Sequence, residues 1–305
     1  MAVAFKAPVK DIVFGYEVVE TYDVISKIPA FSDFNEDIVI PTMEECAKFA
    51  EEVLAPINAI GDQQGATIKD GKVTMPKEFI DAYKSFSEAG WASISLPSEI
   101  GGGGMPIALS GGTLEILSTA NLAFGLAPGL AAGAISAINF HGSEDQKAKF
   151  LPKLVSGEWT GTMNLSEPQS GSDLGTITTK AEPLEDGSYK ITGTKVWITF
   201  GEHDLTDNII HLVLAKIPGS PEGTKGISMF IVPKVMVNDD GSLGDDNNVS
   251  CISIEEKLGI HASPTCVMEY DGSIGCLVGE ENRGLNYMFT ICLLYTSDAA
   301  DDGTG

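Results

Sequence analysis

The sequence is poor in basic residues. Its 305 residues include 19 Lys and Arg against 43 Asp and Glu, so the formal net charge is -24. A surface of that sign repels phosphate backbones and anionic headgroups, and we therefore expect neither nucleic-acid nor membrane partners. The remaining composition, with 43% hydrophobic and 20% charged residues, is typical of a globular protein. A chain of this length is expected to form about two domains.

Cysteine and histidine are also scarce, and neither occurs with the spacing of a metal site. The five cysteines include no CxxC pair, which argues against a zinc knuckle and a disulfide scaffold. We therefore expect reduced thiols and a cytoplasmic location. The four histidines are dispersed along the chain, so no metal ligand is predicted. The sequence also lacks a Gly-x-Ser-x-Gly elbow, a Walker loop and a His-Glu-x-x-His helix, which are common catalytic templates.

One long segment, 116–140, contains no charged residue. Membrane-spanning helices are usually rich in Leu and flanked by basic residues. This segment instead contains Gly125, Pro128 and Gly133, and no Lys or Arg lies close to either end. We interpret it as two Ala- and Gly-rich core helices that are broken at Pro128.

The first half of the chain has helical periodicity. Thr42 and Glu45 form a capping box before an apolar face, and Pro56 is expected to end that helix. Another helix is predicted to begin near Pro76 and to end at Gly90.

The helical pattern continues to the middle of the chain. Ser143 and Gln146 predict the start of a further helix. No strand-like alternation occurs before Trp159. We therefore predict an all-helical domain over residues 1–158, in which 1–40 form a leader segment.

From Trp159 the pattern changes to short runs rich in β-branched residues. The runs at 189–191 and 195–199 flank a Thr-Gly-Thr sequence, which predicts a hairpin. Short strands with turns and no helices between them indicate an antiparallel barrel or sandwich over residues 159–280. The predicted fold class is therefore α+β, with an N-terminal all-α domain followed by an antiparallel β-barrel or sandwich domain.

The end of the chain does not complete a third element. An apolar helix begins near Gly284, but its apolar face is lost after Leu294. We interpret residues 281–292 as the start of a C-terminal helical domain. Residues 293–305 look like translated vector sequence, and we expect them to be a non-native tail.

The densest group of candidate functional residues is the segment 163–173, Met-Asn-Leu-Ser-Glu-Pro-Gln-Ser-Gly-Ser-Asp. It lies at the predicted domain junction, which is a common place for a cofactor site. Ser166 and Ser172 supply hydroxyl groups, and Gly171 allows a ligand to approach the backbone closely.

A second candidate segment is Lys-Val-Trp-Ile-Thr at 195–199. Trp197 offers a flat apolar surface, and Thr199 offers a hydrogen-bonding group beside it, which together suit a planar heterocycle. On these residues alone, a polar turn next to a core tryptophan is as well supported as a cofactor site.

Four segments together resemble the acyl-CoA dehydrogenase family. They are 163–173, 191–201, 257–266 and 278–285, and they occur in the family's order after a helical region. The resemblance implies FAD as the cofactor, an acyl-CoA thioester as the substrate and an electron-transfer flavoprotein as the electron acceptor. Residues 5–10 and 31–37 also resemble the leader of the branch that acts on 3-(methylthio)propionyl-CoA in dimethylsulfoniopropionate degradation; a fatty acyl-CoA is the other candidate substrate.

The resemblance also implies roles for individual residues. Ser172 corresponds to a residue that contacts the CoA portion of the substrate and the phosphate region of the cofactor, and Thr199 to one that bonds near flavin N5. The full set of implied cofactor-binding residues is Met163 and Leu165 through their backbone, Ser166, Trp197, Ile198 and Thr199.

The reaction implied by the resemblance is α,β-dehydrogenation of the thioester. A carboxylate removes the α proton while the β hydrogen leaves as hydride to the flavin. In the family this carboxylate comes from a C-terminal helical bundle, which this sequence lacks, and Glu280 and Glu281 match a linker motif instead. No catalytic residue is therefore predicted. We expect the 305-residue chain to be inactive and the full-length protein to be a homo-oligomer.

Two alternatives remain open. An acyl-CoA oxidase or a related flavin monooxygenase would share the fold and differ in its electron acceptor. A non-catalytic CoA-binding module would belong to another class of protein and would not bind FAD.

Overall fold

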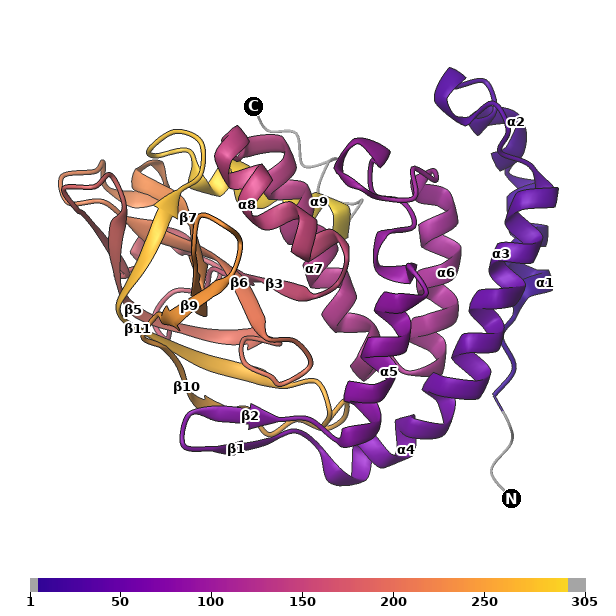
Figure 1. Cartoon of the computed structure of the whole chain (residues 1–305), viewed down its shortest axis with the longest axis horizontal. Coiled ribbons are helices and arrows are strands. Elements are labelled where there is room, and N and C mark those ends of the chain that lie inside the picture. The colour runs from indigo at the N-terminus through magenta and orange to yellow at the C-terminus, as the bar shows by residue number, and fades with distance from the viewer. Residues whose placement is uncertain (1–4, 296–305) are drawn as a thin grey trace.

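The computed structural model describes residues 5–295, with side chains described as far as residue 290. Most helices lie on one side of the molecule and most strands on the other, with α7 and α8 between them (Figure 1). The α-helices are α1 (Val9–Val18), α2 (Thr21–Ile25), α3 (Glu36–Phe49), α4 (Ala55–Gln64), α5 (Lys77–Glu88), α6 (Ile107–Ala120), α7 (Leu122–His141), α8 (Glu144–Val155) and α9 (Gly284–Tyr295). The predicted non-native tail lies mostly outside the described residues.

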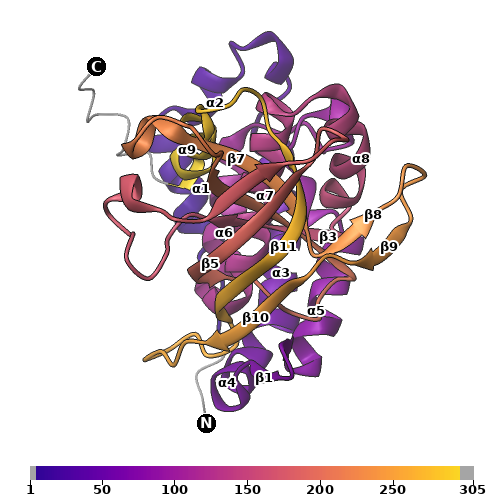
Figure 2. The same ribbon diagram turned by 90° about the vertical axis from the view of Figure 1, so that its left-hand side faces the viewer.

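A large mixed sheet forms the β region, and Figure 2 shows its strands from the side opposite the first helices. Seven strands form this sheet, in the order β10-β11-β5-β4-β6-β3, and β7 pairs with β11 and β6. The strands of the described chain are β1 (Thr67–Lys69), β2 (Lys72–Thr74), β3 (Trp159–Asn164), β4 (Lys180–Pro183), β5 (Tyr189–Thr199), β6 (Asn208–Lys216), β7 (Ile227–Pro233), β8 (Val235–Val237), β9 (Leu243–Asp246), β10 (Val249–Ile254) and β11 (Thr265–Leu277).

The α+β class is confirmed, and most neighbouring strands of the sheet are antiparallel as expected, but the sheet is mixed and not purely antiparallel. β3 runs parallel to β6 along six residue pairs from Trp159–Asn208 to Asn164–Val213, and β4 also meets β6 in parallel. Parallel neighbours need a long connection. The chain between β3 and β6 provides this connection. It contains β4 and β5, and it returns the chain to the end of the sheet at which β3 begins, since Trp159 pairs with Asn208.

The predicted hairpin around residue 193 is also wrong, because β5 is one continuous strand. Thr192 pairs with Lys180 on one side and with Asp271 on the other, so this part of the strand lies inside the sheet. Gly193 serves a close approach and not a turn. A Cβ at this position would lie 2.4 Å from Oγ1 of Thr179.

The first helices differ from the predicted boundaries. α3 begins before Thr42, with the side chain of Asn35 accepting a hydrogen bond from the Asp37 N–H at 2.9 Å. The predicted capping box at Thr42 is therefore wrong, and this hydroxyl instead donates to the Ile38 carbonyl inside the helix at 2.7 Å.

Pro56 does not end the helical run either. A π-helical turn (Ala50–Leu54) links α3 to α4, and Pro56 lies in the first turn of α4, where its missing N–H is tolerated. The Leu54 carbonyl accepts a hydrogen bond from the Asn121 side chain at 3.2 Å. By contrast, the predicted end of α5 at Gly90 and the capping box of Ser143 and Gln146 are confirmed.

The charge-free segment forms two helices as predicted, but the break lies at Asn121 and not at Pro128. The Asn121 side chain accepts a hydrogen bond from the Phe124 N–H at 3.1 Å and so caps α7, which continues through Pro128. Among the described residues, α7 is the helix long and apolar enough to cross a membrane by length and composition. In this fold it packs against β3, α8 and α9.

Helix α7 links the two halves of the core. Its first turns, including Phe124 and Ala127, are buried in the helical cluster. Ala134 and Ile138, further along, are buried with Leu212 of the sheet. Because one continuous helix belongs to both clusters, the helices and the sheet pack together through α7.

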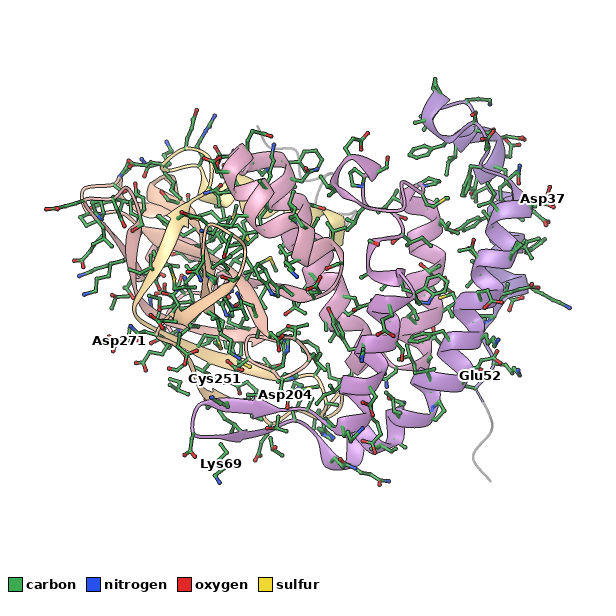
Figure 3. The ribbon with its side chains drawn as sticks, viewed as in Figure 1. Asp37, Glu52, Lys69, Asp204, Cys251 and Asp271 are labelled. Carbon is green, nitrogen blue, oxygen red and sulfur yellow. The ribbon has the colours of Figure 1, made fainter. Side chains whose placement is uncertain are left out.

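The helical region also contains a small hairpin, so the expectation of an all-helical region before Trp159 is wrong. β1 and β2 pair with each other and contact β10, where a Cβ at Gly71 would lie 3.6 Å from the Cys251 carbonyl oxygen. The Met75 N–H, after β2, donates to Asp204 Oδ1 at 2.8 Å. Figure 3 shows Cys251 and Asp204 beside this hairpin.

A pair of glycine substitutions tests the packing of the loop before α6. A Cβ at Gly102 would lie 2.2 Å from the Leu96 carbonyl oxygen, so we expect Gly102→Ala to lower the free energy of unfolding by about 1–3 kcal/mol. Gly111, on the exposed face of α6, has nothing within 4 Å, and Gly111→Ala should raise it by about 0.5–1 kcal/mol. Urea denaturation measures both, and equal effects would contradict the expected backbone contact.

Candidate functional site

The segment 165–173 follows directly from β3, which is anchored on one side by a column of buried polar pairs. Thr160 Oγ1 lies 2.9 Å from His203 Nε2, and Thr162 Oγ1 lies 2.7 Å from His211 Nδ1. The last residue of the strand, Asn164, accepts a hydrogen bond from the Tyr270 hydroxyl at 2.9 Å. The segment therefore starts from a fixed point.

A fully buried ion pair joins this segment to β5. Lys195 Nζ donates to Glu167 Oε1 at 2.9 Å and to the Leu165 carbonyl at 2.9 Å, and the side chains are 0% and 1% exposed. Although burial raises the pKa of Glu167, the Lys195 charge and the hydrogen bonds from 178–179 outweigh it and hold the pKa at about 2. This carboxylate is therefore ionised but only weakly basic, and its bonded oxygens make it a poor candidate for a catalytic base.

Trp197 lies at a β-bulge. Ile198 pairs with Cys266 and Lys195 with Met268, so Val196 and Trp197 together oppose one residue of β11. Trp197 has a φ of 60°, a left-handed conformation that is costly for a bulky residue. Trp197 is 57% exposed, although Val196 and Ile198 on either side of it are buried.

The two candidate segments meet in the structure. The Val196 N–H donates to the Ser166 carbonyl at 2.9 Å, and a Cβ at Gly171 would lie 3.5 Å from Cζ3 of Trp197. The backbone of the segment thus lies against the Trp197 ring, as close approach at a glycine allows.

The predicted site residues differ in what they offer to a ligand. Ser172 is exposed, and Ser166 and Thr199 are partly buried. Met163 and Leu165 are also partly buried and pack against the core under the sheet. The Ile198 side chain is buried in the β core, so that only its backbone can face a ligand.

Three hydroxyl groups in this region are unpaired. Within the part of the chain that the structure describes, those of Ser166, Ser172 and Thr199 form no hydrogen bond. The neighbouring hydroxyls of Ser170 and Thr179 are bonded, at 2.6 Å to the Asp173 carbonyl and at 2.5 Å to Glu167. Within segments 163–173 and 195–199 these are the hydroxyls that the sequence singles out, although Thr192 and Thr194 on the same strand also form no side-chain hydrogen bond among the described residues.

The sequence patterns assigned no role to Glu167 and Lys195, although both lie inside the candidate segments. The burial of Lys195 could have been predicted from the alternation of a strand. Ile191 and Lys195 are four positions apart, so their side chains point to the same, inward face. A charged residue at an inward strand position requires a buried partner. The alternation along the strand did not predict that this partner is Glu167.

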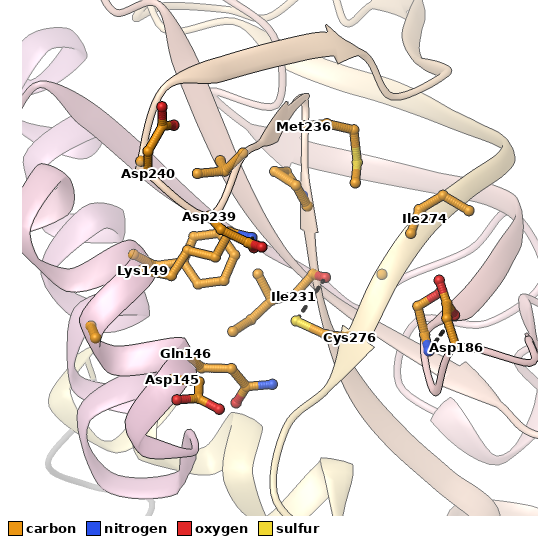
Figure 4. A pocket seen from close by; sticks show the side chains of 17 residues that line it. Asp145, Gln146, Lys149, Asp186, Ile231, Met236, Asp239, Asp240, Ile274 and Cys276 are labelled. Carbon is orange, nitrogen blue, oxygen red and sulfur yellow. Dashed lines mark hydrogen bonds and ion pairs between the residues drawn. The ribbon is translucent and has the colours of Figure 1, made fainter.

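The structure also has a cavity of about 700 Å³ away from these segments, which Figure 4 shows. It contains none of the predicted site residues. Carboxylates of Asp145, Asp186, Asp239 and Asp240 line it, and its ammonium group, Lys149, already lies 3.5 Å from Asp239. An anionic ligand is disfavoured there, so the cavity does not replace the candidate site.

Two family profiles match the chain. The profile described as "Acyl-CoA dehydrogenase, N-terminal domain" matches residues 42–158, and "Acyl-CoA dehydrogenase, middle domain" matches residues 162–273. The chain therefore belongs to the acyl-CoA dehydrogenase family, and the resemblance noted in the sequence is confirmed.

Individual relatives agree with this assignment. The chain is 47% identical over 285 residues to 3-methylmercaptopropionyl-CoA dehydrogenase of Ruegeria pomeroyi, covering 93% of this chain and 48% of that protein. It is 27% identical, with a TM-score of 0.70, to the acyl-CoA dehydrogenase complexed with FAD from Bacillus anthracis, covering 87% and 41% of the two chains. A chain from the structure of the electron transferring flavoprotein of Acidaminococcus fermentans matches at 26% identity and a TM-score of 0.69, covering 85% and 62%. The chain spans about half the length of the curated relatives it matches.

The buried histidines behind β3 predict a specific pH dependence. Burial lowers the pKa of His211 from 6.5 to about 3, so below pH 6.5 the unfolded chain binds a proton that the folded protein does not. This contribution to stability is complete above pH 6.5 and is lost as the pH falls toward 3. His211→Asn should therefore flatten the dependence of the unfolding free energy on pH in this window, by up to about 1.4 kcal/mol per pH unit.

Urea denaturation between pH 4 and pH 7 measures this difference. The exposed His261 is the control. Hydrogen bonding to the carbonyls of Asp62 and Lys257 raises its pKa, so its replacement should change the pH dependence of the unfolding free energy in the opposite direction. Parallel curves for wild type and His211→Asn would contradict a neutral buried imidazole.

Proposed function

We propose that this chain is part of an FAD-dependent acyl-CoA dehydrogenase and that the segments around Ser166 and Trp197 bind the flavin. The observation that carries the proposal is the meeting of the two segments, where the backbone at Ser166 and Gly171 lies against the exposed Trp197. Membership of the family supports it independently.

The residues present fit the cofactor. A planar ring system can stack on the exposed face of Trp197, and the Ser166 and Thr199 hydroxyls can bond to its polar edge. The backbone at Met163, Leu165 and Ile198 would flank the same group. When bound, FAD supplies the acceptor for a hydride, which no amino-acid side chain provides.

The substrate would bind next to the flavin, at the exposed end of segment 163–173. We assign Ser172 to the CoA portion, since its hydroxyl is exposed and unpaired at the outer end of the segment. The name of the Ruegeria pomeroyi relative favours 3-(methylthio)propionyl-CoA, and a fatty acyl-CoA is the other candidate. We further propose a cytoplasmic, homo-oligomeric full-length protein with an electron-transfer flavoprotein as its partner.

No base for the α proton is assigned to the described chain. Glu167 is ionised, but Lys195 and the 178–179 segment occupy its oxygens. We therefore propose that the base belongs to a C-terminal helical domain that follows the helical domain of residues 1–158 and the β domain of 159–280. On this view residues 281–292 begin that third domain and 293–305 are a non-native tail.

The test is made on the full-length protein. It should purify yellow and lose its flavin absorbance when acyl-CoA is added without oxygen. Rapid reoxidation by oxygen would favour an oxidase or monooxygenase, and a colourless protein that rejects added FAD would favour a non-catalytic CoA-binding module. The 305-residue chain should bind FAD weakly and show no turnover, and measurable dehydrogenase activity would contradict this.

A single hydroxyl tests the placement of the flavin. Thr199→Val removes an unpaired hydroxyl and keeps the shape, so the dissociation constant for FAD should rise by roughly three- to tenfold. Thr192→Val is the matched control, because Thr192 is an exposed threonine on the same strand. Titration of flavin fluorescence measures both, and equal dissociation constants for the two variants would contradict the placement.

A further inference from the structure

We propose that Glu167 and Lys195 are positioning residues that set the placement of Ser166 relative to Trp197 for flavin binding. The proposal rests on the proposed function, because it gives a role in that site to two residues outside the predicted set. Neither side chain has access to a ligand, since they are 1% and 0% exposed.

The first step is the geometry around Ser166. Lys195 Nζ donates to the Leu165 carbonyl and to the Glu167 carboxylate, both at 2.9 Å. One ammonium group therefore holds the residues on either side of Ser166. The Val196 N–H adds a bond to the Ser166 carbonyl itself at 2.9 Å.

The second step is the link to Trp197. Lys195 is the last regularly paired residue of β5 before the bulge, opposite Met268, and Trp197 follows within it. The ion pair thus connects the Ser166 segment to the base of the bulge. A bulge re-aims the side chains that it carries, so a fixed base gives the Trp197 ring a defined direction.

The third step concerns the other hydrogen bonds of the Glu167 carboxylate. Glu167 accepts hydrogen bonds from the N–H and hydroxyl of Thr178, at 2.6 and 2.9 Å, and from those of Thr179, at 3.0 and 2.5 Å. Gln169 donates at 2.7 Å. The carboxylate therefore cannot turn toward another partner, and Lys195 is held by a fixed acceptor.

Stability alone does not account for this pair. A buried ion pair is often no more stabilising than apolar residues of the same volume, because desolvation offsets the attraction between the charges. The pair instead supplies directional bonds at two points that flank the candidate site. Groups that orient a binding residue in this way commonly change ligand affinity when they are removed.

The experiment compares Lys195→Met with a control variant in the full-length protein. Lys195→Met keeps the length of the side chain and removes its bonds. Asn247→Ala is the control, because Asn247 is also buried and bonds to the Pro233 carbonyl and to the backbone of Ile274, away from both candidate segments. The melting temperature, the acrylamide quenching of Trp197 without FAD and the dissociation constant for FAD are measured for each. Trp197→Phe identifies the part of the emission that belongs to Trp197.

We expect Lys195→Met to change the quenching of Trp197 and to raise the dissociation constant for FAD by about 10- to 100-fold. Asn247→Ala should lower the melting temperature and leave the other two values unchanged. If Lys195→Met lowers only the melting temperature, or if Asn247→Ala changes quenching and affinity equally, the pair is merely structural and the proposal is wrong. Should Lys195→Met fail to fold, Glu167→Gln replaces it, and its quenching and affinity support or overturn the proposal in the same way.

The two proposals can fail separately. If wild-type protein binds no FAD, the proposed function fails, while the quenching of Trp197 still reports whether the pair positions the ring. If FAD binds and the quenching and affinity of Lys195→Met equal those of wild type, the proposed function stands and the positioning role is lost.

Discussion

The buried contact between Glu167 and Lys195 is the constraint on which the candidate site depends. It ties the chain that leaves β3 to the strand that carries Trp197. Removing two charges from water is costly, and the cost is offset only when both ions have a full set of partners. Here the threonines at 178 and 179 and the Leu165 carbonyl complete that set, so three separate stretches of chain are brought to one point.

The placement of β3 explains why this point lies where the helices meet the sheet. β3 runs parallel to β6 at the edge of the sheet, and α7 packs against it. The buried pairs of Thr160 with His203 and of Thr162 with His211 hold the strand on its sheet side. A segment that leaves such a strand is fixed at its start, while its outer end at Ser172 is exposed. That combination suits a site that a ligand enters from outside.

Local rules predicted features whose causes are local. The capping box of Ser143 and the end of α5 at Gly90 follow from bonds and backbone angles within a few residues, and the structure has both. The same local rules wrongly predicted a helix end at Pro56, a helix break at Pro128 and a turn at Gly193. A π-turn accommodates Pro56, and a helix already begun at Asn121 contains Pro128. A close approach by Thr179 explains Gly193.

By itself, the sequence predicted a helical region followed by a strand-rich one from residue types and their spacing, and its resemblance to a family singled out the hydroxyls and the tryptophan of the candidate site. The tertiary structure alone decided that β3 and β6 are parallel, that Trp197 lies at a bulge and that Lys195 meets Glu167. Those features depend on which distant segments become neighbours. Glu167 and Lys195 are 28 positions apart, so no sequence periodicity connects them. Only the folded structure shows that their charges are buried together.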